Sequence, residues 1–377
     1  MSGQVGARRL KAELLARVPW EVEQCDVLAV FERPLRVCVW VHALAGNPEV
    51  RLYQAEGQDF TLASTLTLPK MAALSAAGKE VCFAQGERFQ PGRLVFAALD
   101  ELPSTYRMSE FAFPFADLAW GADARRVVAS TAGCWPLGIL WDGDSNERRN
   151  LEAEQLPYSY HEPAVSMASA QQFVAVSRGY GVAEIYDPAM PFATLTPTVF
   201  EYGSSIGVGQ ISTRSLSLSY DASQIMMCGC SDTSTHFLRG TVDLAEVQKP
   251  RSDSDRPYWL DPEAGPLSCD PACPEEAWLR VFPSAPRICR SHASEFEVTG
   301  YARSVDLDAG SGVLVAASTS DVTLGLVASE EAAATLSTTF TTLEEQAESV
   351  RLGCGGTLLG CASTHGLSVW RVAVPSQ

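Results

Sequence analysis

Four residues in the least regular part of the sequence have the types and spacing of zinc ligands. Cys269, Cys273, Cys289 and His292 follow the pattern C-x3-C-x15-C-x2-H. Zn²⁺ binds thiolates and imidazoles, and a bound ion could fold a loop that has little apolar core of its own. Incidental thiols are the other interpretation, because the first pair encloses Pro271 and the chain has 11 cysteines. Apart from this zinc site, the sequence predicts no cofactor.

Motifs for catalysis are missing from the sequence. It contains neither the G-x-S-x-G motif of hydrolases nor the H-E-x-x-H motif of metalloproteases. His236 and His365 lie near expected strand ends, where hydrogen bonding in a turn is the favoured role. Four aspartates are expected to stabilise turns by accepting bonds from nearby backbone N–H groups: Asp142, Asp187, Asp306 and Asp308. We therefore predict no catalytic residues and no enzyme activity.

Arginines and ring-bearing side chains gather in the middle of the chain. Arginine binds phosphate, and aromatic rings stack on RNA bases, so these residues are candidates for RNA binding. They are Arg125, Arg126, Arg148, Arg149, Tyr160, His161 and Arg178. Ordinary surface charge is the alternative interpretation. The net charge of −17 argues against nucleic-acid binding through bulk electrostatics, although it permits a local basic patch.

The stretch Phe115–Gly143 shows the unit that must position these residues. Two apolar runs alternate like strands on either side of a turn at Gly121-Ala122-Asp123. A second turn, built on Gly133 and Pro136, leads to a run that ends in Trp141-Asp142. This order of strands and turns is typical of one blade of a WD-repeat propeller.

The same order recurs along the chain in seven windows: Asp26–Ser64, Lys70–Pro114, Phe115–Gly143, His161–Tyr202, Ser215–Leu244, Ala302–Phe340 and Glu348–Val374. Small residues recur at one strand end, as in VVASTAG, VAASTSD and GCASTHG, and are expected to suit the narrow inner part of a blade. We predict an all-β, WD40-like β-propeller of about seven four-stranded blades. Another many-stranded β fold, such as a double sandwich, is the alternative.

Two segments depart from the repeats. In Met1–Trp20, apolar residues recur at helical spacing opposite basic ones, which predicts a short amphipathic helix that caps a propeller spanning residues 21–377. A docking helix or a basic targeting element is the alternative. Gln248–Glu297 is rich in Pro, Asp and Ser, and we expect an irregular insertion or a degenerate blade there.

The placement of the cysteines and the hydropathy of the sequence indicate the cellular compartment of the protein. The odd number of cysteines fits poorly with a fully paired disulfide framework, and most of them lie in apolar runs. No stretch is apolar over the length of a membrane span, and the first residues lack the core of a signal peptide. We expect a reducing compartment, the nucleus or alternatively the cytoplasm, with no membrane partner and no small-molecule substrate.

Three phrases of the chain resemble the telomerase Cajal body protein family of WD-repeat proteins. They are VVASTAGCWPLGILWDG with Tyr160-His161 downstream, GYGVAEIYDP with a later GQIST, and ARSVDLDAGSGVLVAASTSDVTLGL. The resemblance covers roughly Phe115–Thr235 and Ala302–Trp370. The chain departs from the family between Leu244 and Ala302, where the expected blade is not recognisable.

The resemblance implies a nuclear assembly or localisation factor that binds small Cajal-body or telomerase RNA. From the fold and the resemblance together, we expect a non-catalytic scaffold within a ribonucleoprotein. The alternative is a protein-only interaction platform in a larger complex, which the acidic balance favours.

Overall fold

The computed structural model describes the first and last parts of the chain almost continuously and shorter stretches between them. The described residues are 10–56, 59–67, 73–77, 80–85, 92–102, 104, 107–111, 115–120, 126–131, 138–142, 148–150, 166–170, 173–177, 182–186, 198–201, 212–219, 221–230, 234–242, 294–299, 302–318, 320–326, 339–353 and 355–374. Within this part of the chain, no helix is long and apolar enough to cross a membrane.

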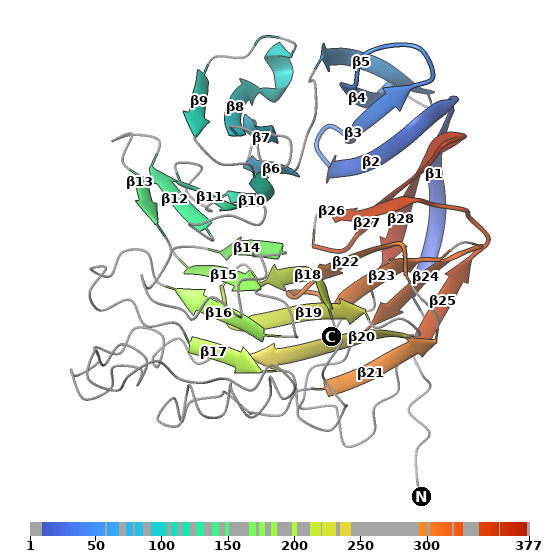
Figure 1. Cartoon of the computed structure of the whole chain (residues 1–377). Helices are drawn as coiled ribbons and strands as arrows, with labels where there is room; N and C mark the ends of the chain where they lie inside the picture. Colours follow the sequence, from blue (N-terminus) through green and yellow to red (C-terminus); the bar gives the residue numbers. More distant parts are fainter. Residues whose placement is uncertain are drawn as a thin grey trace, which may run out of the picture.

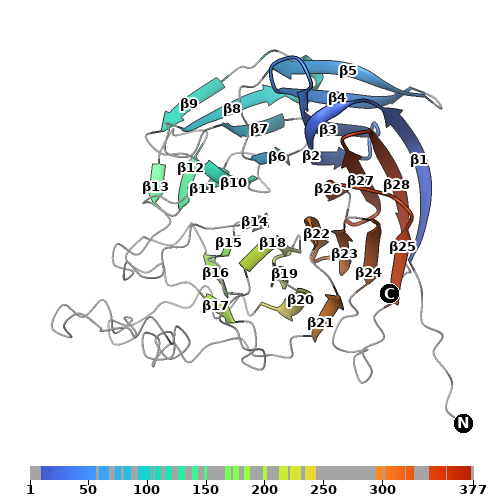
Figure 2. The same ribbon diagram turned by 45° about the vertical axis from the view of Figure 1, so that its right-hand side comes forward.

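These residues form seven antiparallel sheets of four strands each, arranged around a central axis (Figures 1 and 2). Blade 1 contains β2 (Val22–Phe31), β3 (Arg36–Ala43), β4 (Glu49–Glu56) and β5 (Asp59–Thr67). Blade 2 contains β6 (Ala73–Ala77), β7 (Glu80–Gln85), β8 (Gly92–Ala98), the short 3₁₀ helix η1 (Leu99–Glu101) and β9 (Arg107–Phe111). Blade 3 contains β10 (Phe115–Trp120), β11 (Arg126–Thr131), β12 (Gly138–Asp142) and β13 (Arg148–Asn150).

The remaining blades follow the same plan. Blade 4 contains β14 (Ser166–Ala170), β15 (Phe173–Ser177), β16 (Val182–Tyr186) and β17 (Thr198–Glu201). Blade 5 contains β18 (Ser212–Leu218), β19 (Gln224–Cys230), β20 (Ser234–Thr241) and β21 (Ser294–Thr299). Blade 6 contains β22 (Ser304–Asp308), β23 (Val313–Ala317), β24 (Val322–Leu326) and β25 (Thr339–Leu343). Blade 7 contains β26 (Ser349–Gly353), β27 (Leu358–Ser363), β28 (Gly366–Ala373) and β1 (Lys11–Pro19).

Blade 7 joins the two ends of the chain, since its three inner strands come from the end of the sequence and its outermost strand is β1. The prediction of an N-terminal helix is therefore wrong over Lys11–Pro19. The helix-like spacing in the sequence comes from a β-bulge in β1. The bulge is seen as a shift in the register with β28 between Leu14 and Ala16. A bulge resets the alternation of side chains along a strand. The apolar residues on its two sides then have a spacing that looks helical in the sequence.

The segment Gln248–Glu297, expected to be irregular, ends within a strand of blade 5, because Ser294–Glu297 belong to β21. β20 pairs with β21, from Ser234 opposite Thr299 to Arg239 opposite Ser294. The chain therefore leaves this sheet after its third strand and returns to it as the fourth. Residues 243–293 lie outside the described residues.

The innermost strands of neighbouring blades lie side by side around the axis and run in the same direction (Figure 2). Ser304 of β22 is bonded to Val350 of β26, and Asp306 is bonded to Leu352, so the two strands keep a constant offset. A ring of parallel innermost strands gives the propeller two distinct faces. We call the face at which these strands begin the amino face, and the face at which they end the carboxyl face.

Apolar side chains on both sides of each sheet form the core between blades. In blade 1, Val37, Val39 and Val41 pack toward blade 7, whereas Cys38 and Leu52 on the opposite side pack toward blade 2. Successive residues of a strand point to opposite faces, and β-branched residues suit such a pleated, buried position. The strands of a blade therefore read as nearly continuous apolar runs.

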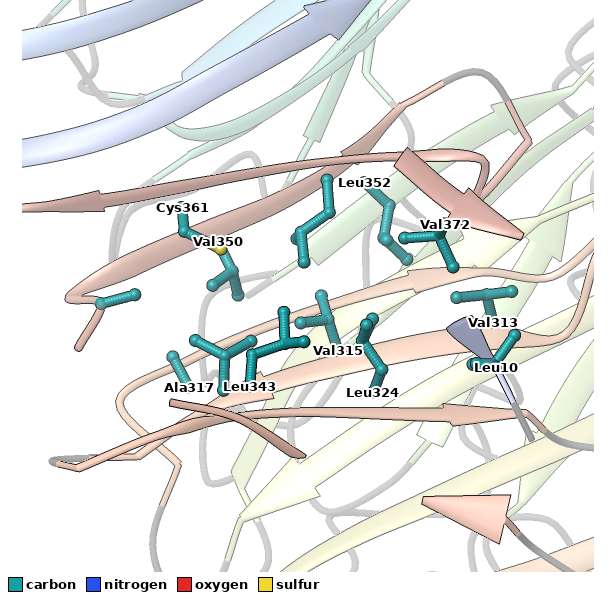
Figure 3. Packing of buried hydrophobic residues seen from close by; sticks show 13 residues of the cluster. Leu10, Val313, Val315, Ala317, Leu324, Leu343, Val350, Leu352, Cys361 and Val372 are labelled. Carbon is teal, nitrogen blue, oxygen red and sulfur yellow. The ribbon is translucent and has the colours of Figure 1, made fainter. Parts of the chain in front are cut away.

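The same packing places the beginning of the described chain inside the blade 6–blade 7 interface. Leu10 is only 2% exposed and packs with a cluster that includes Val313, Leu324, Leu352 and Val372 (Figure 3). Burial of a leucine side chain stabilises a fold by about 1.5–3 kcal/mol. The segment at β1 is thus part of the propeller, not a cap on it.

Candidate functional site

A polar side chain at the start of β26 links blade 7 to blade 1. The hydroxyl of Ser349 donates a hydrogen bond to Oδ1 of Asp26. The Ser349 hydroxyl oxygen also accepts a hydrogen bond from the backbone N–H of Val27 at 2.9 Å. Both partners belong to β2, the innermost strand of blade 1. This bond pair fixes the register between the first and the last blade.

A buried carboxylate makes the corresponding link between blades 6 and 7. Oδ2 of Asp306 accepts a hydrogen bond from the backbone N–H of Leu352 at 2.7 Å. The Arg351 guanidinium lies 3.5 Å from Oδ1 and also donates to the carbonyl of Val27 at 3.4 Å. Burial raises the pKa of the Asp306 carboxyl, while Arg351 and the Leu352 N–H act in the opposite direction. Asp306 was expected in a turn; it is instead a structural group between blades.

The same type of link recurs farther round the ring. Oγ of Ser304 accepts from the N–H of Val350 at 3.1 Å, and Oγ of Ser217 accepts from the N–H of Ala309 at 3.1 Å. In each case, a side chain of one innermost strand satisfies a main-chain donor of the next blade. Buried N–H groups without partners are costly, so these bonds specify how neighbouring blades dock. The inner ring from blade 5 to blade 1 is thereby held rigid.

Turns on the amino face are also fixed by hydrogen bonds. Oγ of Ser318 accepts from the N–H groups of Ser320 and Asp321, both at 3.2 Å. Oγ of Ser363 similarly accepts from the N–H of His365 at 3.2 Å. The Trp20 indole donates to the carbonyl of Ser363 at 2.8 Å and ties the β1–β2 connection to this turn. These hydrogen bonds hold the β23–β24 turn of blade 6, the β27–β28 turn of blade 7 and the connection from blade 7 to blade 1.

Acidic groups outnumber basic groups on this part of the amino face. The acidic residues are Glu21, Glu23, Glu49, Asp321, Glu344, Glu345 and Glu348, and the basic or titratable ones are Arg17, His42, Arg51, Arg303 and His365. Two ion pairs use some of these groups, Arg17–Glu345 at 2.6 Å and Arg51–Glu49 at 2.6 Å, and Nδ1 of His42 lies 3.4 Å from Oε2 of Glu23. Within the described residues, Glu21, Asp321, Glu344 and Glu348 have no ion pair, which leaves a negative surface.

One large apolar side chain stands on the same face. Leu44 follows β3 in the turn that leads to β4, and it is 62% exposed. The other two exposed leucines of the described chain, Leu14 and Leu62, lie instead on outermost strands. Leu44 therefore gives the negative amino face an apolar contact point. The sequence signal for it is a leucine beside the turn residues Gly46, Asn47 and Pro48, and our sequence analysis did not single it out.

Comparison with solved structures agrees with this architecture. No protein-family model and no curated protein matches the sequence. The β-propeller domain of Cps50 (Swd1) from Myceliophteria thermophila superimposes with a TM-score of 0.58 at 12% sequence identity. The match covers 96% of this chain and 100% of that domain. The fold is a WD40-like β-propeller. This confirms the predicted fold class, and the described strands supply the seven four-stranded blades.

Cysteine side chains of the propeller that the structure describes are free thiols in the core. These are Cys25, Cys38, Cys82, Cys228 and Cys361. Burial raises the pKa of Cys38 to about 12, and burial together with the charges of Glu348 and Asp26 raises that of Cys25 to about 12. Nucleophilic attack and metal binding require the thiolate. The described residues contain no cluster of potential metal ligands.

Most of the residues proposed from the sequence lie outside the described residues. This applies to the zinc candidates Cys269, Cys273, Cys289 and His292, and to the RNA candidates Arg125, Tyr160, His161 and Arg178. The backbone places Arg126 on β11, opposite Asp142. It places Arg148 and Arg149 on β13, opposite Trp141 and Leu140. Three of the arginines thus belong to blade 3, and two of them lie on its outermost strand.

Proposed function

We propose that this chain is a non-catalytic interaction platform, and that the amino face of blades 6, 7 and 1 binds a basic partner protein. The observation that carries the proposal is the combination, on one face, of the exposed Leu44 with acidic groups that have no ion pair within the described residues. Complementary charge steers association, whereas an apolar anchor supplies affinity at the centre of a protein interface. Both components are available here.

The described polar groups support a structural role for the inner ring. Ser349, Asp306 and Ser304 use their side chains to join blades, and the thiols of Cys25 and Cys38 are protonated in the core. Groups committed in this way hold a surface in place instead of activating a substrate. A platform protein needs such a fixed surface, because each contact group then loses little conformational entropy when a partner binds.

RNA binding is the second candidate function. It rests on the position of Arg126, Arg148 and Arg149 in one blade and on the resemblance noted in the sequence. In its specific form, the chain would be a nuclear assembly factor for a small Cajal-body or telomerase RNA. Phosphate contacts by these arginines would make binding weaken steeply with salt. The net charge of −17 acts against this alternative.

Affinity purification with and without nuclease separates the two functions. For a protein platform, we expect the same partner proteins after nuclease treatment, with no RNA enriched before it. Recovery of a defined RNA, together with loss of the partner proteins after nuclease, would overturn the platform proposal. In that case, the variant Arg148→Glu with Arg149→Glu should release the RNA. An unchanged RNA yield from this variant would exclude the blade 3 arginines as its binding site.

A further inference from the structure

The outermost strand of blade 1 has a free main-chain edge. β5 pairs with β4 on its inner side, and no other strand of the described part of the chain pairs with its outer side. Among the described backbone hydrogen bonds outside the sheets, none involves residues 59–67. A free edge presents unpaired N–H and C=O groups that can pair with another chain. β5 is nine residues long, which is long for such an edge.

The outer edges of the other blades differ from β5 in charge or in length. Charged residues lie within the outermost strands β1, β9, β13 and β21, with sequences KAELLARVP, RMSEF, RRN and SEFEVT. Strand β17 (TVFE) has, like β5, a charge at one end only, but it is four residues long. Such charges protect edges from adventitious pairing. The uncharged strand β25 is shorter, and Thr341 donates a hydrogen bond from it to the carbonyl of Leu10 at 2.8 Å. β5 has no charge after Asp59, and among the described strands only β4 pairs with it.

Side chains along β5 fit an extended apolar ligand. Leu62 is 51% exposed, and its neighbours Thr61 and Ala63 are exposed as well. Leu62 lies opposite Tyr53 and Ser64 lies opposite Leu52, so Ala63 is the extra residue of a β-bulge. A bulge interrupts the regular edge and limits the length over which another strand can pair. The edge therefore suits one short segment and does not favour open-ended growth of the sheet.

Charged residues near the beginning of β5 indicate which charge a bound peptide segment would carry. Glu56 is exposed at the end of β4 and lies opposite Asp59, and within the described residues it has no ion pair. Asp100 and Glu101 lie at the same end of the neighbouring blade, where Asp100 pairs with Arg36 of β3 at 2.6 Å. Basic residues flanking an apolar strand would complement this acidic end.

We propose that β5 binds an extended segment of a partner protein, with alternating apolar residues and flanking lysines, as an added strand of blade 1. Main-chain hydrogen bonds to the free edge hold the segment, and its apolar residues contact Leu62. A second copy of this chain is a poor occupant, because each copy carries a net charge of −17. One edge-to-edge strand pair also buries far less than the ~1,200–2,000 Å² of a stable interface. This site is separate from the amino face.

The test uses a fluorescent peptide of alternating Val and Thr flanked by lysines, together with the full chain. We expect saturable binding, with protection from amide exchange confined to residues 59–67. Leu62→Lys should weaken binding about tenfold or more, whereas the matched change Leu14→Lys, on the charged edge strand β1, should leave it unchanged. Replacing the central valine of the peptide with proline should abolish binding.

Three results would overturn the proposal. The first is equal affinity of wild type and Leu62→Lys for the peptide. The second is protection of the amino-face turns instead of β5, which would assign the peptide to the other surface. The third is concentration-dependent self-association of the wild-type chain that Leu62→Lys removes, which would make a second copy the occupant. Loss of partners in amino-face variants tests the platform function separately and has no bearing on this result.

Discussion

Ser349 and Asp26 meet across the junction between the last and the first blade, where the Ser349 hydroxyl donates a hydrogen bond to the Asp26 carboxylate. The same hydroxyl accepts the N–H of Val27 at 2.9 Å. The propeller is thus closed twice, by β1 at its outer rim and by this polar contact at its inner ring. Close approach also depends on Gly353, since a side chain there would collide with the carbonyl oxygen of Val30.

Ser349→Ala should destabilise the propeller by about 1–3 kcal/mol, because the buried N–H of Val27 loses its acceptor. Urea denaturation followed by tryptophan fluorescence measures the free energy of unfolding. Thr342→Ala is the matched control, since Thr342 is exposed on β25, and we expect a change within about 0.5 kcal/mol. Equal stability of the two variants would show that the Ser349 contact does not hold the blades together.

Leu10→Ala should cost about 2–5 kcal/mol, because it leaves a cavity in the blade 6–blade 7 core. Arg17→Ala removes the ion pair to Glu345, but Arg17 is 60% exposed, so the expected loss is below about 1 kcal/mol. Thermal and urea denaturation of both variants gives the comparison. A small effect of Leu10→Ala would mean that this side chain contributes little to the core between blades 6 and 7.

Asp306 should make stability depend on pH in a specific direction. Burial raises the pKa of its carboxyl above the usual 3.8, with the charge of Asp308 adding to the rise and Arg351 opposing it. The folded state therefore holds the proton more tightly, so the contribution of this group to stability is greatest at low pH and is lost as the pH rises through the raised pKa.

Asp306→Asn removes this titration while retaining an acceptor for the Leu352 N–H. Relative to wild type, we expect the variant to be less destabilised at about pH 7 than at about pH 4. Urea denaturation across this range measures the difference. A constant difference, or one that favours the variant more at low pH, would contradict the raised pKa of Asp306.

Cys25, Cys38 and Cys361 should resist alkylation in the folded chain. Burial raises the pKa of each thiol, so the reactive thiolate is scarce at about pH 8. Mass spectrometry of peptides from chain treated with iodoacetamide should find these residues unmodified in buffer and modified in urea. Rapid modification in buffer would show that this part of the core opens or that these thiols are accessible.

The repeat pattern predicted the propeller because each blade buries both faces of its sheet. The recurring phrases ending in small residues combine two features. Ala317 and Ala362 are fully buried. Ser318 and Ser363 lie where β23 and β27 end, and each hydroxyl caps the turn that follows. Asp308 fulfils the expected turn role, since its Oδ1 accepts the N–H of Ser311 at 2.7 Å.

Other features depend on contacts between distant residues and could not be read from local patterns. β1 becomes a strand because β28 offers it an edge, although Leu14, Leu15 and Val18 have helical spacing. Asp306 looks like a turn residue in the sequence, and only docking of blade 7 buries it. The amino face likewise gathers Glu21, Glu344 and Leu44 from opposite ends of the chain. No local window contains that surface.

Binding of a partner protein at the amino face is tested most directly by matched charge variants. Leu44→Lys combined with Glu344→Lys alters that face, whereas Leu14→Lys combined with Glu13→Lys makes the same changes on β1. Quantitative mass spectrometry after nuclease-treated affinity purification compares both variants with wild type. We expect the first variant to lose the partner proteins and the second to retain them, with equal thermal stability. Retention of the partners by both variants, or equal loss from both, would contradict the assignment of the amino face as the binding surface.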